Sequence, residues 1–275
     1  MTFALAFPTI DPVAVEIGPV AIRWYALSYV VGLLLGWQYV RYLAGNCIEG
    51  MTKRHADDLL VFGTLGVVVG GRLGYVLFYQ PGYYFSNPGE IFVVWQGGMS
   101  FHGGALGVIV VVVLYTRIMK ISLLSVADAV CAQVPIGLFL GRMANFVNGE
   151  LYGRVSDVSW AMVFPGGGPE PRHPSQIYEA ILEGLVLFTI LAFAVHMRRV
   201  VRRPGTVAGM FFAGYGVARI IAELFREPDA FLGFILPGIS MGQVLSLPMI
   251  VLGLFLILRI PPVPRIDGRA GGQAG

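Results

Sequence analysis

The hydrophobic positions of this chain fall into seven long runs. They cover residues 24–44, 57–79, 102–119, 124–143, 176–196, 206–226 and 240–260, with few charges inside them. About 20 apolar residues in a helix are enough to cross the roughly 30 Å hydrocarbon core of a bilayer. The pattern therefore predicts an all-α integral membrane protein with about seven transmembrane helices, because a membrane β-barrel would show alternating polar and apolar positions.

The composition supports this interpretation. Hydrophobic residues make up 56% of the chain and charged residues only 13%, whereas an ordinary soluble domain has roughly 25% charged residues. The two cysteines, Cys47 and Cys131, are too few for a disulfide framework and do not form a metal motif. Residues 1–23 lack the basic start of a cleaved signal peptide.

Basic residues divide the connections between these helices into two sets. Arg23, Arg154 and Arg172 lie in one set, and twelve basic residues lie in the other: Arg41, Lys53, Arg54, Arg117, Lys120, Arg198, Arg199, Arg202, Arg203, Arg259, Arg265 and Arg269. Since basic connections stay in the cytoplasm, we expect a periplasmic N-terminus, a cytoplasmic C-terminus and a periplasmic loop between helices four and five. Residues 1–260 then form a single polytopic membrane domain, and we expect 261–275, rich in glycine and proline, to be a disordered cytoplasmic tail.

Glycines at four-residue spacing mark the second run. Gly66, Gly70 and Gly74 lie on one helix face, and small residues at this spacing let two helices approach closely. We therefore expect a packing role for them.

Twelve costly polar residues in or next to the runs fall toward the periplasmic ends. Such groups are functional candidates, because burying them in a membrane is unfavourable unless they are paired or hydrated. The residues concerned are Tyr25, Arg72, His102, Arg142, Asn145, Asn148, Glu150, Glu179, Glu183, Arg219, Glu223 and Arg226. Their common depth predicts one polar site near the outer face.

The sixth run shows the clearest pattern. Tyr215, Arg219, Glu223 and Arg226 share one face of a helix. Such a face cannot contact lipid, so it must line a cavity or meet charges of other helices. Arg142 and Asn145 also share a face if the fourth helix continues past residue 141.

Several of these residues have a structural explanation as well. Arg72 can pair with Glu179 or Glu183, and Glu223 can serve only to neutralise a neighbouring arginine. Asp128, near the cytoplasmic side, fits a helix start or a packing position. The glycines around His102 allow an irregular turn, and that histidine fits either a general base or a hydrogen-bonding lid.

Arg142 and Arg219 are harder to explain by structure alone. The outer halves of the helices contain more cations than the deep carboxylates need. A surplus of guanidinium groups in a membrane cavity suits a phosphate, because one arginine can donate two parallel hydrogen bonds to two phosphate oxygens. We therefore predict a phosphate-bearing ligand at this pair.

Seven motifs, in order from about residue 7 to 258, resemble those of bacterial prolipoprotein diacylglyceryl transferases. The motifs are IDP at 10–12 with RWY at 23–25, GRLGY at 71–75, SFHGG at 100–104, GRMANFVNGE at 141–150, RHPSQIYE at 172–179, FREPD at 225–229 and MGQ at 241–243. The combination is specific and covers nearly the whole chain.

The resemblance implies an enzyme of the bacterial cytoplasmic membrane whose active site faces the periplasm. Its substrates would be phosphatidylglycerol, a membrane lipid, and preprolipoprotein signal peptides with a lipobox cysteine; the products would be a thioether and glycerol 1-phosphate. No cofactor, metal or nucleic acid is implied. The implied catalytic residues are Arg142, Arg219, His102 and Tyr25. Phosphatidylglycerol would be bound by Arg142, Asn145, Asn148, Glu150, Gly153, Tyr215, Arg219, Glu223 and Arg226.

Two other functional classes fit the residues less well. A lipid transporter or channel would need a charged path toward the cytoplasm, and the inner halves of the runs carry almost no charge. An intramembrane protease would need a Ser/His or Asp/Asp arrangement, which the sequence does not show.

Overall fold

The computed structural model describes residues 5–8, 10–197, 200, 202–227, 234–236 and 238–259. The predicted tail at 261–275 and residues 228–229 of the FREPD motif lie outside these ranges.

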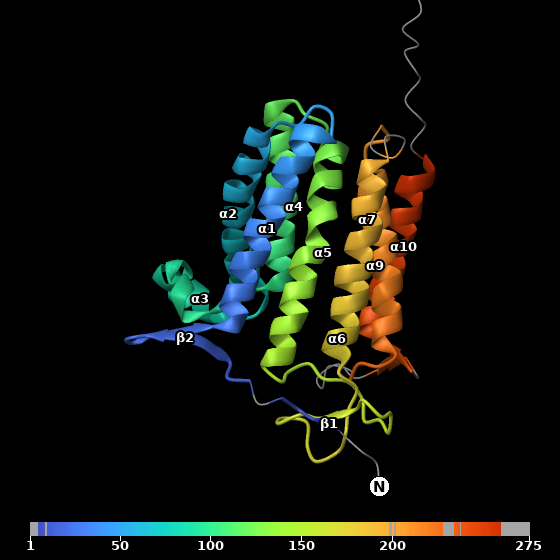
Figure 1. Cartoon of the computed structure of the whole chain (residues 1–275). Helices are drawn as coiled ribbons and strands as arrows, with labels where there is room; N and C mark the ends of the chain where they lie inside the picture. The colour runs from blue at the N-terminus through green and yellow to red at the C-terminus, as the bar shows by residue number, and fades with distance from the viewer. Residues whose placement is uncertain are drawn as a thin grey trace, which may run out of the picture.

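Long helices run side by side through most of the molecule (Figure 1). They are α1 (Trp24–Asn46), α2 (Lys53–Phe78), α4 (Phe101–Met119), α5 (Leu123–Val147), the continuous α6 (Ser175–Glu179), η3 (Ala180–Val186) and α7 (Leu187–His196), α9 (Thr206–Glu223) and α10 (Met241–Arg259). Five of these helical segments are long and apolar enough to cross a membrane: α2, α4, α5, the segment Ser175–His196 and α10 as far as Leu258. The prediction of a helical membrane protein is confirmed at this level.

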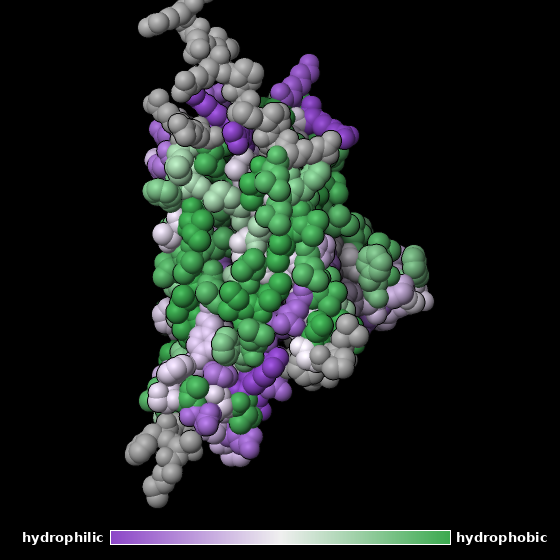
Figure 2. All heavy atoms as spheres, turned by 90° about the vertical axis from the view of Figure 1, so that its right-hand side faces the viewer, coloured by the Kyte–Doolittle hydropathy of each residue, from purple (hydrophilic) through white to green (hydrophobic). Residues whose placement is uncertain are grey.

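The surface has the distribution expected of such a protein. Figure 2 shows mainly hydrophobic residues across the middle of the molecule and hydrophilic residues gathered at its two ends. A lipid-facing surface is apolar because no water is present there to solvate polar groups.

Short elements that the hydrophobic pattern did not predict gather at one end. They are three two-stranded sheets, β1 (Leu5–Ala6) with β4 (Met162–Val163), β2 (Val13–Ile17) with β3 (Val20–Arg23) and β5 (Phe234–Leu236) with β6 (Ile239–Ser240), and the short helices α3 (Pro81–Ser86), η1 (Pro88–Phe92) and η2 (Val94–Gln96). Figure 1 shows β1, β2 and α3 at the end near the N-terminus. The all-α description therefore holds for the helical bundle and not for this end.

Polar caps set the helix starts that matter for the site. Ser100 Oγ accepts a hydrogen bond from Gly103 N (3.2 Å), which fixes the start of α4 next to His102. The C-terminal end of α5 also differs from the prediction: this helix continues to Val147, four residues beyond the predicted span. Arg142 and Asn145 are therefore on one helical face, as expected.

The glycine stripe of α2 packs against α4. A Cβ atom added at Gly70 or Gly74 would collide with the backbone of Gly103, and one at Gly66 would collide with Gly107. The predicted packing role of these glycines is confirmed. Their close contact fixes α4, and with it His102, against α2.

Candidate functional site

A cavity of about 690 Å³ lies between α4 and α5 on one side and α9 and α10 on the other. Its walls are mostly apolar, with Leu138, Phe211 and Met249 among the lining residues. Its polar lining includes six residues predicted from the sequence: His102, Arg142, Tyr215, Arg219, Glu223 and Arg226. The structure therefore brings together six candidates from three helices and the segment that follows α9.

Glu179 holds the two principal arginines together. Its Oε2 forms an ion pair with Arg142 Nη2 and accepts a hydrogen bond from Arg219 Nη1, and both distances are 2.7 Å. Glu183 lies farther away, 3.7 Å from Arg142 and 3.5 Å from Arg219. Both carboxylates are fully buried. Because a buried carboxylate needs charged partners, this arrangement fixes the spacing of the two guanidinium groups.

A π-helical stretch lies at this point of the fold. Residues Ala180–Val186 form a π-helix between α6 and α7, and such insertions often mark functional positions. Glu179 immediately precedes the stretch and Glu183 lies within it. The insertion therefore sets how these two carboxylates face α5 and α9.

Glu223 forms a second ion-pair centre on the cavity wall. It pairs with Arg219 on the same helix, and its Oε1 is 3.6 Å from Arg226 Nη1. The interpretation of Glu223 as a neutralising partner is confirmed in its geometry. Since Glu223 also lines the cavity, its carboxylate can act on a ligand as well.

The expected surplus of positive charge is wrong within this cluster. Among the described residues, the three arginines Arg142, Arg219 and Arg226 meet three glutamates at Glu179, Glu183 and Glu223. Glu179 and Glu183, which were possible partners of Arg72, meet Arg142 and Arg219 instead. Each guanidinium has five donors, these ion pairs occupy only part of them, and both Arg142 and Arg219 line the cavity.

Arg72 has entirely different partners from those expected. Its guanidinium is buried and donates to five backbone carbonyls, at 2.6 to 3.2 Å, of Glu90, Ile91, Val93, Gly97 and Gly98. It also lies over the ring of Tyr84, 5.0 Å from the centroid. The predicted pairing with Glu179 or Glu183 is therefore wrong, and Arg72 instead fixes the irregular segment that precedes α4.

His102 lines the cavity in an exposed position. Within the described residues its only specific contact is an edge-on ring contact with Phe101, at 5.7 Å between centroids. No hydrogen bond within the described chain therefore fixes the tautomer of this imidazole. This geometry is compatible with either role considered from the sequence.

Tyr25, Asn145, Asn148 and Glu150 are not part of the lining of this cavity. Asn145 and Asn148 donate to Glu150 Oε1 over 2.8 and 3.3 Å. Tyr25 contacts the hydroxyl of Tyr29 at 3.2 Å. Asn145 follows Arg142 on α5, Asn148 and Glu150 come directly after that helix, and Tyr25 lies in the first turn of α1.

The turn after α5 is held in an unusual conformation. Leu151 has a positive φ of 57°, which is costly for a residue with a Cβ. Gln176 donates to the carbonyl of Glu150 (2.6 Å) and Ser175 to that of Leu151 (3.0 Å). Two side chains of α6 therefore hold the turn that places Glu150.

The loop between α5 and α6 is attached to the C-terminal end of α9. Gly153 N donates to His173 O (2.8 Å), and a Cβ atom at Gly153 would collide with the carbonyl of Phe225. Arg154 donates to the carbonyls of Glu223 (3.1 Å) and Arg226 (2.9 Å). Gly153 thus permits a close backbone approach, and Arg154, whose role the sequence did not suggest, caps the end of α9.

Asp128 couples α5 to α9 at the opposite end. Its carboxylate accepts hydrogen bonds from the backbone N–H groups of Gly205 and Ala208, both 2.7 Å long. It therefore caps the start of α9 rather than the start of its own helix. Arg154, in the loop after α5, and Asp128, on α5, therefore hold the two ends of α9.

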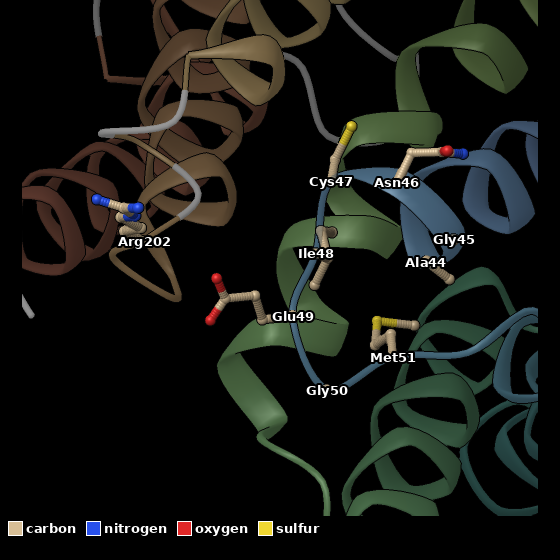
Figure 3. Close-up of a pocket in the computed structure, with 9 residues that line it drawn as sticks. All are labelled: Ala44, Gly45, Asn46, Cys47, Ile48, Glu49, Gly50, Met51 and Arg202. Atoms are coloured by element: carbon tan, nitrogen blue, oxygen red, sulfur yellow. The ribbon is translucent and has the colours of Figure 1, made fainter. Parts of the chain in front are cut away.

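A second cavity, of about 460 Å³, lies at the end of the molecule away from the arginine cluster. Figure 3 shows its lining residues, which include Cys47, Glu49 and Arg202. Burial raises the pKa of the Cys47 thiol, which disfavours the reactive thiolate. None of the predicted site residues lines this cavity, so it is separate from the site described above.

Comparisons with known proteins identify the family of this chain. Residues 12–259 match the family described as prolipoprotein diacylglyceryl transferase. The phosphatidylglycerol–prolipoprotein diacylglyceryl transferase of Paramagnetospirillum magneticum is 60% identical over 258 residues, which is 94% of this chain and 96% of the relative. The enzyme of the same name from Rhodospirillum rubrum is 56% identical and covers 98% of this chain and 100% of the relative. This chain belongs to the prolipoprotein diacylglyceryl transferase family.

Proposed function

We propose that this chain transfers the diacylglyceryl group of phosphatidylglycerol to the lipobox cysteine thiol of preprolipoproteins. The reaction forms a thioether, releases glycerol 1-phosphate and is the first step of bacterial lipoprotein maturation. The observation that carries the proposal is the pair Arg142 and Arg219 on the wall of a largely apolar cavity. Such a cavity can hold acyl chains and a phosphate together, and the names of the relatives specify both substrates.

The arginines act on the phosphate. The thiolate attacks the glycerol carbon next to the phosphate ester, a carbon–sulfur bond forms, and the carbon–oxygen bond breaks to give a phosphate monoester. This leaving group gains negative charge, which Arg142 and Arg219 stabilise through N–H groups that Glu179 does not use. Glu223 and Arg226 hold Arg219 and contribute to phosphatidylglycerol binding, with Tyr215 beside them.

The thiol proton is transferred to His102. This imidazole lines the cavity and has no hydrogen bond within the described residues. A thiol with a pKa of about 8.5 supplies some thiolate without a base, so His102 ranks below the arginines. Tyr25, Asn145, Asn148, Glu150 and Gly153 organise the periplasmic rim of the site.

We also propose the membrane arrangement. All seven long helices cross the bacterial inner membrane within one polytopic domain of residues 1–260, with the N-terminus and the loop between α5 and α6 in the periplasm. Arg41 lies near the end of α1, and Lys53 and Arg54 begin α2. The end of α1 and the start of α2 lie at the end of the bundle away from the N-terminus (Figure 1), and basic residues favour the cytoplasmic side. The active site then faces the periplasm and the C-terminus the cytoplasm.

Mass spectrometry of a lipobox peptide tests the function directly. The purified protein, incubated with phosphatidylglycerol and the peptide, should add one diacylglyceryl group to the cysteine. A peptide with serine in place of the cysteine is the control and should stay unmodified. An unchanged cysteine peptide would contradict the proposal and favour a lipid-binding protein without chemistry.

A further inference from the structure

The MGQ motif at 241–243 has no part in the reaction described so far, yet it lies on the cavity. Ser240, Met241, Gly242 and Ser246 all belong to the lining. Ser240 and Gln243 cap each other: Gln243 N donates to Ser240 Oγ (3.3 Å), and Ser240 N donates to Gln243 Oε1 (3.1 Å). This reciprocal cap fixes where α10 begins.

The Glu223 carboxylate lies directly against the first turn of α10. A Cβ atom built on Gly242 would lie 2.8 Å from Glu223 Cδ and 3.2 Å from its Cγ, and it would overlap Oε1. N–H groups in the first turn of a helix have no partner within the helix, and the helix dipole favours a negative charge there. Only a glycine leaves room for the carboxylate in this position.

Glu223 cannot move aside without losing its partners. It is buried, its carboxylate pairs with Arg219 and lies 3.6 Å from Arg226, and its carbonyl accepts a hydrogen bond from Arg154. A side chain at position 242 would therefore displace the carboxylate from the arginines rather than separate the helices.

We infer that Gly242 is a positioning residue: its missing side chain seats Glu223 on the start of α10 and so fixes Arg219 and Arg226 at the cavity. This inference rests on the proposed function. It adds α10 to the elements that set the arginine geometry.

Gly253 on the same helix offers a matched contrast. A Cβ atom at Gly253 would meet backbone atoms, the nitrogen of Ala213 and the carbonyl oxygen of Gly209 on α9. Backbone cannot swing aside as a side chain can, so Gly253→Ala should separate α9 from α10. Gly63 on α2, with nothing within 4 Å of an added Cβ, supplies a neutral control.

The test measures peptide modification and thermal unfolding of the full-length protein in detergent. Gly242→Ala should lower kcat by about 10- to 100-fold, because small displacements of catalytic groups have effects of this size. Its KM for phosphatidylglycerol should change less than about threefold, and its melting temperature should fall less than that of Gly253→Ala. Gly253→Ala should lower the melting temperature, and Gly63→Ala should change neither quantity.

A size-compensating pair distinguishes positioning from a general structural effect. Aspartate is one methylene shorter than glutamate, so Glu223→Asp withdraws the carboxylate from an alanine at position 242. The double variant Gly242→Ala/Glu223→Asp should be about fivefold or more active than Gly242→Ala alone, since contacting residues are energetically coupled.

The outcomes separate this inference from the proposed function. A wild-type protein that leaves the peptide unmodified would overturn the function itself. An active wild type with a fully active Gly242→Ala variant, or a double variant no better than the single one, would overturn the positioning role. So would a Gly242→Ala variant that loses activity only in proportion to its loss of folded protein.

Discussion

Arg72 on the one hand, and Arg142 and Arg219 on the other, look alike in the sequence and differ completely in the structure. Arg72 is enclosed by five backbone carbonyls and an aromatic ring. Arg142 and Arg219 are held by carboxylates and line a cavity of about 690 Å³. All three guanidiniums lie toward the same end of the helices.

The partners explain what each group can do. Carbonyl oxygens satisfy the Arg72 donors without neutralising its charge, and the result is a rigid segment before α4. Glu179 and Glu223 use only part of the donor sets of Arg142 and Arg219, so donors remain for a ligand. A buried arginine therefore marks a reaction site only when open space and unused donors accompany it.

The largest difference between the two groups should appear with Arg142→Lys. Lysine keeps the charge but loses the planar pair of donors that binds a phosphate. We expect kcat/KM for peptide modification to fall about 100- to 1,000-fold, the usual effect of removing one donor to a developing oxyanion. The melting temperature in detergent should change by only a few degrees. Near-normal thioether formation in both Arg142→Ala and Arg219→Ala would contradict the assignment.

Arg72→Ala should show the opposite behaviour. It leaves five carbonyls without their donor, and one unsatisfied buried group already costs about 1–3 kcal/mol. We therefore expect a lower melting temperature and faster proteolysis between residues 90 and 98. Activity per folded molecule should stay within about tenfold of the wild type, because Arg72 does not line the cavity. An intact melting temperature with lost activity would place Arg72 in the chemistry.

The sequence predicted the helices better than the partners. Continuous apolar runs determine spans, and the spacing of Arg219, Glu223 and Arg226 determines one helix face. Whether Glu179 meets Arg72 or Arg142 depends on how α5 and α6 pack, to which the π-helical stretch contributes. The partners of Arg72 could not be predicted from residue types, because they are backbone carbonyls and every residue has one. The role of Gly242 was equally hidden, because it depends on Glu223 of another helix.

Within the arginine cluster, the two buried glutamates should differ. Glu179 Oε2 bridges both arginines at 2.7 Å, whereas the nearest contacts of Glu183 are 3.5 and 3.7 Å. Glu179→Gln removes the charge that sets the arginine spacing, so kcat should fall about 10- to 100-fold. Glu183→Gln, the matched isosteric change, should lower kcat less than about fivefold. Equal losses would show that the cluster acts through total charge and not through the bridge.

The smallest effect should come from His173, in the loop that pins α9 through Gly153 and Arg154. Its ring packs edge-on against Tyr178 and Phe225, and burial lowers the pKa of His173 below its usual 6.5. The unfolded loop therefore binds a proton more readily than the folded one, and stability present above about pH 6.5 is lost as the pH falls below that value. Limited proteolysis of the loop should be faster at pH 5.5 than at pH 7.5 in the wild type. This pH difference should disappear in His173→Phe, which keeps a ring but cannot titrate. If the difference persists in that variant, another group controls the loop, and the attachment of α9 does not depend on the neutral His173.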